Sequence, residues 1–140
     1  MLDAFRELID ELIAAPKVLR DAGFAQSTNP EAIAALGLLA ARDAAVRERI
    51  QTVIRQETPL LPAPPESVDA SGLHAGSALA AFDTGRGELV SLLMNLTLKD
   101  WERIGIDWTG HERSVADDVE EHVEYDEETV ATITDQIAAA

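Results

Sequence analysis

Four prolines within seven residues divide this sequence of 140 residues into two halves. They occupy positions 59, 62, 64 and 65 in the run TPLLPAPPES. A helix interior does not tolerate such a run, because proline lacks an amide N–H and its ring clashes with the preceding turn. We therefore expect an extended connection here, packed on the rest of the protein through Leu60 and Leu61.

The half before the prolines predicts two helices. The first is expected from about Leu2 to Ala22, because apolar residues recur there every three or four positions, and Gly23 is expected to end it. Pro16 lies inside this pattern and predicts a kink or a break. The pair Asn29-Pro30 predicts the start of the second helix, since Asn accepts from free N–H groups and Pro fits the first turn. That helix is expected to run to about Gln56.

The half after the prolines also predicts two long helices. The first is expected from about Ser77 to Leu96, with a middle weakened by Gly85 and Gly87 by roughly 1 kcal/mol each relative to Ala. A short turn is expected over residues 97–101. Ser114-Val115-Ala116-Asp117 resembles a capping box and predicts the start of the last helix, which should run to about Ile137. The sequence thus predicts one all-α domain over residues 1–140, a four-helix bundle with a long proline-rich crossover between helices 2 and 3.

Composition excludes several functional classes. The chain has 26 acidic against 11 basic residues, a formal net charge of −15, which opposes binding to nucleic acid or to an anionic membrane surface. It has no cysteine, which excludes disulfides and thiolate chemistry. Neither a membrane-spanning apolar run nor a signal peptide is recognisable, so we expect a cytoplasmic protein. No GxGxxG, GxxxxGK[ST], HExxH or GxSxG motif occurs.

The three histidines are the first candidates for a metal or catalytic site. His74 and His111 stand beside glycines and are expected in exposed loops. His122 lies on the last predicted helix, with Tyr125, Asp126 and Thr129 at +3, +4 and +7. His122 and Asp126 could share a metal or could pair with each other, and the second interpretation is favoured because a transition metal normally needs three protein ligands.

Other side chains near His122 are interpreted structurally. The neighbouring glutamates are expected to form a solvated helix face: Glu120, Glu121, Glu124, Glu127 and Glu128. Trp101 and Trp108 are both expected to pack beneath the segment before the last helix.

Three segments resemble motifs of one bacterial family. They are LLAARD at 38–43, ELVSLLMNLTLKDW at 88–101 and SVADDVEEHVEYDEET at 114–129. They resemble, in turn, the HLAxRD segment, the LLxxLtxedW helix end and the HDxxH helix of the DinB/YfiT-like four-helix bundles. The resemblance spans the chain in element order, the long crossover included, and implies the bundle fold.

The same resemblance implies a metal site that this sequence lacks. The family's three histidines, which typically bind nickel or zinc, fall on Leu38, Tyr125 and Thr129. We therefore expect no metal and no cofactor. A pocket lined by Leu38, His122, Tyr125, Asp126 and Thr129 is expected to remain, open to a small-molecule ligand.

Three functions follow from these expectations. The favoured one is a non-catalytic module that binds a small ligand or a partner. The alternative is a metal-dependent hydrolase or thiol-dependent transferase that uses a shifted site around His122 and Asp126, with a metal or as an acid–base pair. The third is a structural homodimer formed through a face of the bundle.

Overall fold

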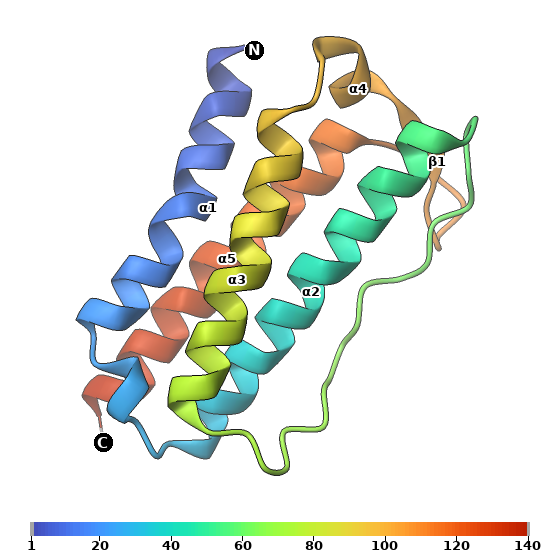
Figure 1. Ribbon diagram of the computed structural model, residues 1–140. Coiled ribbons are helices and arrows are strands. Elements are labelled where there is room, and N and C mark those ends of the chain that lie inside the picture. Colours follow the sequence, from blue (N-terminus) through green and yellow to red (C-terminus); the bar gives the residue numbers. More distant parts are fainter. Residues whose placement is uncertain (1, 140) are drawn as a thin grey trace.

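Four long helices form the body of the protein in a computed structural model that describes residues 2–139. They are α1 (Asp3–Asp21), α2 (Pro30–Arg55), α3 (Ala75–Met94) and α5 (Val115–Ala138), and a 3-10 helix η1 (Phe24–Gln26) follows α1. Helices α1 and α2 each pack against both α3 and α5. Figure 1 shows α2 and α3 running in one direction and α1 and α5 in the other. The predicted all-α four-helix bundle is confirmed, and within residues 2–139 no helix has the length and apolar character of a membrane span.

The helix boundaries follow local capping chemistry. The Asn29 side chain accepts from the N–H groups of Glu31 and Ala32 at the start of α2. At the start of α5, Ser114 and Asp117 accept from each other's backbone N–H, which completes the predicted capping box. Gly23 follows α1 with φ +84°, a left-handed conformation that favours glycine. Helix α3 begins and ends about two residues earlier than expected.

Pro16 does not break α1, contrary to one of the two expected outcomes. The helix continues through this buried proline to Asp21. A proline has no N–H, so the carbonyl oxygen of Leu12, four residues earlier, receives no helical hydrogen bond from it. The Arg86 Nη1 atom of α3 donates to that oxygen at 2.8 Å instead. The cost of the proline is thus offset by a contact between helices.

The segment between α3 and α5 is more structured than the sequence predicted. The expected turn is a short helix, α4 (Leu98–Glu102), which a capping box between Thr97 and Asp100 begins. It is followed by two antiparallel strands, β1 (Ile104–Ile106) and β2 (Glu112–Ser114). Each strand has three residues, too few for an alternating pattern to stand out from the sequence, so this hairpin was missed.

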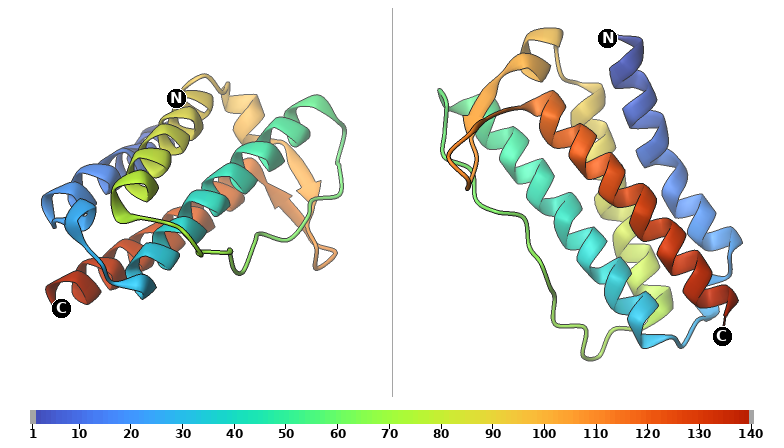
Figure 2. Two further views of the ribbon diagram at one scale, coloured as in Figure 1. Left: turned by 60° about the horizontal axis from the view of Figure 1, so that its bottom comes forward. Right: turned by 180° about the vertical axis from the view of Figure 1, so that it is seen from behind.

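Residues 56–74 join α2 to α3 along the outside of the bundle, as both views of Figure 2 show. Part of this segment pairs with β1, where the Leu61 N–H donates to the Ile106 oxygen and the Ile106 N–H donates to the Pro59 oxygen, each at 2.8 Å. Leu61 is 5% exposed, as expected, but Leu60 is 80% exposed. Side chains alternate along an extended chain, so only one of two adjacent leucines faces the core.

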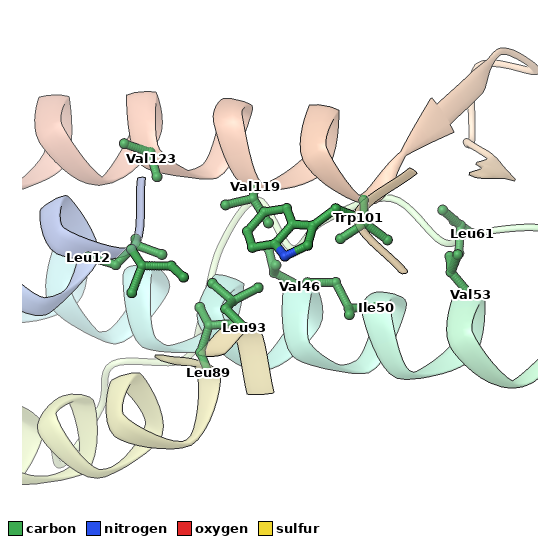
Figure 3. Close-up of a cluster of buried hydrophobic side chains, with 12 residues drawn as sticks. Leu12, Val46, Ile50, Val53, Leu61, Leu89, Leu93, Trp101, Val119 and Val123 are labelled. Carbon is green, nitrogen blue, oxygen red and sulfur yellow. The ribbon is translucent and has the colours of Figure 1, made fainter. Parts of the chain in front are cut away.

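The interior contains two apolar clusters. We call the first the Trp101 cluster; Figure 3 shows most of its members, which are Ile9, Leu12, Val46, Ile50, Val53, Leu61, Leu89, Leu93, Trp101, Val115, Val119 and Val123. The second, the Phe24 cluster, comprises Ala15, Leu19, Phe24, Ala32, Ile33, Leu36, Leu39, Ala75, Ala78, Leu79, Phe82 and Ile133. Each cluster takes residues from all four long helices, so the bundle is packed along its whole length.

Candidate functional site

A layer of buried charged and polar side chains separates the two clusters. On α2, Asp43 lies between Leu39 of the Phe24 cluster and Val46 of the Trp101 cluster. On α3, Arg86 lies in the same way between Phe82 and Leu89. Helix α5 contributes two members. We call the set the arginine layer; it consists of Asp43, Arg86, His122 and Asp126, none more than 5% exposed.

Arg86, on α3, is the centre of this layer and bonds to each of the other three long helices. Its Nε and Nη2 atoms donate to Asp43 Oδ2 and Oδ1 on α2 at 3.0 and 2.9 Å. Nη2 also donates to Asp126 Oδ1 on α5 at 2.7 Å, while Nη1 donates to the Leu12 oxygen on α1. The planar guanidinium suits this arrangement, because its donors have a fixed fork geometry.

His122 pairs with Asp43 and forms no hydrogen bond with Asp126 among the described residues. Its Nε2 atom lies 2.6 Å from Asp43 Oδ1. The predicted structural pair of His122 with Asp126 is therefore wrong. The reason is that Arg86, on a third helix, takes Asp126 and leaves Asp43 on α2 to face the imidazole.

Burial and charge act in opposite directions on this layer. Burial favours a neutral Arg86, but Asp43 and Asp126 outweigh it and raise the pKa of the guanidinium above its ordinary value. Burial also raises the pKa of Asp126, and the attraction of Arg86 only partly offsets that effect. Two buried carboxylates thus share one permanent cation.

A second buried ion pair lies nearer to α4. Arg49 of α2 donates through Nε and Nη2 to the two carboxylate oxygens of Asp118 on α5, each at 2.9 Å. The two side chains are 5% and 6% exposed. Arg113 of β2 extends this pair towards the surface, where it contacts Asp107 and Glu121.

A cavity of about 20 Å³ lies between α2 and α5, beneath residues of the 56–74 segment and the hairpin loop. It borders the arginine layer through His122 and the second ion pair through Arg49. Its lining residues are Arg42, Val46, Arg49, Pro64, Trp108, Asp118, Glu121, His122 and Tyr125.

Two of the five predicted pocket residues, His122 and Tyr125, line this cavity, and the other three do not. Leu38 and Thr129 are half-buried on α2 and α5, and Asp126 lies in the arginine layer. Tyr125 packs under a guanidinium, with Arg42 Cζ 4.1 Å from the ring centroid. Among residues 2–139, no group of three His, Cys, Asp or Glu side chains is placed to hold a metal ion.

The other singled-out residues divide into exposed and buried sets. His74 and His111 are exposed, as expected. Trp101 is 1% exposed and stacks on Phe5, but Trp108 is 41% exposed, contrary to expectation. Trp108 follows β1 in the hairpin loop, and Arg113 Cζ lies 5.0 Å from its ring. The glutamates expected on the outer face of the last helix are all exposed: Glu120, Glu121, Glu124, Glu127 and Glu128.

Comparison with known proteins identifies the architecture. No protein-family model matches the sequence, and no curated protein matches it. Among solved structures, the chain is similar to YfiT from Bacillus subtilis, described as a probable metal-dependent hydrolase with an unusual four-helix bundle topology. The TM-score is 0.81 at 17% sequence identity, and the match covers 97% of this chain and 87% of YfiT. The chain has the YfiT fold. The resemblance to the DinB/YfiT-like bundles is therefore confirmed for the fold.

Sequence reasoning missed the central residues of this YfiT-like bundle, although a signal was present. The buried apolar residues of α2 skip from Leu39 to Val46, and those of α3 skip from Phe82 to Leu89. Each gap of seven residues omits one core position, and a charged residue stands there. Two charges of opposite sign at skipped core positions of neighbouring helices would have predicted the pair of Asp43 with Arg86.

Proposed function

We propose that this YfiT-like bundle has lost the family metal site and works as a non-catalytic module that binds a small ligand or a partner. The observation that carries the proposal is the position of the Arg86 guanidinium. It lies in the buried layer between α2, α3 and α5, bonded to the carboxylates of Asp43 and Asp126. A cation that is part of the chain thus supplies the positive charge that these two buried carboxylates need.

The donor set at the family ligand positions does not fit nickel or zinc. Leu38 has no lone pair to offer, and a neutral Tyr125 or Thr129 is a poor ligand for either metal. The Tyr125 ring is moreover covered by Arg42, whose positive charge disfavours a metal cation beside it.

The alternative, a shifted active site around His122 and Asp126, would have to use two side chains that already bond to other residues of the bundle. The Nε2 atom of His122 is bonded to Asp43, and an oxygen of Asp126 is bonded to Arg86. A general base needs its proton-accepting atom within reach of a substrate, and both of these atoms have protein partners. We therefore propose the binding module in preference to the hydrolase or transferase.

The test is the metal content of untagged protein purified without immobilised metal, followed by calorimetric titration with nickel and zinc. We expect substoichiometric metal and weak binding. The variant with Leu38→His, Tyr125→His and Thr129→His restores the family's donor set and should bind either metal far more tightly than the wild type. Tight stoichiometric metal in the wild type that disappears in His122→Ala would overturn the proposal in favour of the shifted site.

Self-association is a separate proposal. A homodimer formed through a face of the bundle would be a way for such a module to present its surface. Light scattering over a range of protein concentrations tests it: a mass of one chain at every concentration contradicts the dimer.

A further inference from the structure

Arg49 has more hydrogen-bond donors than the protein uses. Its Nε and Nη2 atoms are held by Asp118, but Nη1 is buried and finds no acceptor among residues 2–139. The side chain is only 5% exposed, and it lines the cavity between α2 and α5. A buried N–H group without an acceptor destabilises the folded protein, and more so when the group is charged. Such a group therefore points to an acceptor that comes from outside the chain.

Arg42 repeats the pattern two turns earlier on α2. Its Nε atom is buried without an acceptor among residues 2–139, and over the same residues Arg42 forms no ion pair. This is notable in a chain with a net charge of −15, where acidic partners abound. Residues seven apart lie on the same face of a helix, which brings Arg42 and Arg49 to the same cavity.

The acidic residues around the cavity do not supply the missing acceptors. Both oxygens of Asp118 are occupied by Arg49, and Glu121 pairs with Arg113. The cavity wall therefore combines two cationic donors that lack acceptors with two carboxylates that have cations. An anion placed in the cavity would meet free N–H groups rather than free carboxylates.

We propose that this cavity binds the carboxylate group of a small organic acid. Arg49 Nη1 and Arg42 Nε each donate one charge-assisted hydrogen bond to an oxygen of that group. The cavity volume of about 20 Å³ is close to that of a single water site, so only the end group of a ligand would enter it, and a flat carboxylate needs less room there than a tetrahedral phosphate. The rest of the ligand lies against Trp108, which is 41% exposed, and Pro64 at the cavity wall.

The inference names a ligand class for the small-ligand function and rests on that function. It is tested by following the side-chain Nε–H signals of Arg42 and Arg49 by NMR, at constant ionic strength, while acetate, benzoate or inorganic phosphate is added. Constant ionic strength separates specific binding from general screening of the exposed charges. We expect saturable shifts with the carboxylates, tighter binding of benzoate than of acetate, and weaker binding of phosphate.

Two variants of equal charge identify the site. Arg42→Met should weaken benzoate binding about tenfold or more, the loss expected for one charge-assisted hydrogen bond. Arg55→Met removes an exposed arginine from the same helix and should leave binding unchanged within about twofold. Arg42→Lys keeps the charge without the planar fork and should also bind more weakly, which covers the case in which Arg42→Met is poorly folded.

Three results would overturn the inference: no saturable shift with either carboxylate, tighter binding of phosphate than of benzoate, or equal benzoate binding by wild type and Arg42→Met. The outcome is distinguishable from that of the metal analysis. A protein with tight metal that still binds benzoate through Arg42 contradicts the proposed loss of metal alone. A metal-free protein that binds no carboxylate contradicts this inference alone.

Discussion

The Phe24 cluster and the arginine layer are adjacent on the same helices, yet different forces stabilise them. The cluster is held by burial of aliphatic and aromatic surface, which is non-directional and depends mainly on volume. The layer is held by hydrogen bonds and ion pairs from Arg86 to Asp43, Asp126 and the Leu12 oxygen, each with a required geometry. The cluster should therefore tolerate changes of shape, whereas the layer should tolerate almost no loss of a partner.

The largest expected effect comes from removing the central cation. Arg86→Met leaves Asp43 and Asp126 buried without their cation and should lower the free energy of unfolding by about 3–5 kcal/mol, measured by urea denaturation. Arg47→Met is the matched control, because Arg47 pairs with Glu88 at the surface and should cost about 1 kcal/mol or less.

A combined variant shows whether the buried charge causes that loss. Adding Asp43→Asn and Asp126→Asn to Arg86→Met removes both uncompensated carboxylates and should recover part of the lost stability. If the triple variant is no more stable than Arg86→Met, lost packing rather than charge explains the effect, and the contrast between layer and cluster fails.

A truncation in the Phe24 cluster is expected to cost slightly less. Leu36 is fully buried, and Leu36→Ala should lower the free energy of unfolding by about 2–5 kcal/mol through lost burial and a residual cavity. Leu36→Met, which conserves volume, should cost less than about 1.5 kcal/mol. If Leu36→Met lowered the free energy of unfolding as much as Leu36→Ala, the Phe24 cluster would depend on exact side-chain geometry as the arginine layer does. Leu98→Ala, at a site that is 46% exposed, provides the surface control.

The pH dependence separates two buried aspartates with opposite shifts. The pKa of Asp126 is raised, so its folded form retains a proton that the unfolded chain loses. The stabilisation from that proton is present at low pH and disappears as the pH rises through the raised pKa. The stability advantage of wild type over Asp126→Asn should therefore shrink between pH 4 and pH 7, measured by urea denaturation across that range.

Asp107 supplies the control of opposite sign. Hydrogen bonds from Thr109, His111 and Arg113 hold its pKa well below the ordinary value, the Thr109 side chain first among them. Its stabilisation is present above the ordinary pKa and is lost in acid, so the advantage of wild type over Asp107→Asn should grow as the pH rises from 2 to 4. If the stability advantage of wild type changed in the same direction with rising pH at Asp126 and at Asp107, the assignment of opposite pKa shifts to these residues would be wrong.

The smallest effect concerns the helix that presents Arg86. Gly87 is exposed on α3, and a Cβ added there meets no atom within 4 Å. Gly87→Ala should raise the melting temperature, since it adds about 0.5–1 kcal/mol of stability by restricting the unfolded chain. Gly23→Ala is the contrasting variant and should lower it, because φ +84° strains an alanine. A destabilised Gly87→Ala would show that Arg86 needs local adaptability in α3.

The predictability of the fold and of the site differed for a physical reason. Helix starts at Asn29-Pro30 and at Ser114 depend on neighbouring residues, so the sequence predicted both. The arginine layer depends on contacts between residues 40 or more positions apart, such as Arg86 with Asp43 and Asp126. Periodicity can indicate that a charged residue occupies a core position, but it does not select the partner from among 26 acidic residues.

The short strands and the crossover show the same limit. The pairing of Leu61 with Ile106 decides which of two adjacent leucines is buried, and that register is set across 45 residues of chain. The same pairing explains the glycine at position 105, because a Cβ there would lie 2.7 Å from the Leu61 side chain. The residues around the prolines indicate neither this register nor the need for glycine at position 105.

Pro16 has a consequence for how α1 docks on the other three helices. Apolar residues recur along α1 every three or four positions, so hydrophobic packing alone would tolerate a slip of the helix by one turn. Elsewhere in a helix interior each carbonyl oxygen already accepts from the N–H four residues later, and only the proline releases one, that of Leu12. Because Arg86 bonds to this oxygen, α1 has one preferred axial height and one preferred rotation. A residue that ordinarily interrupts helices thereby gives the bundle a unique register.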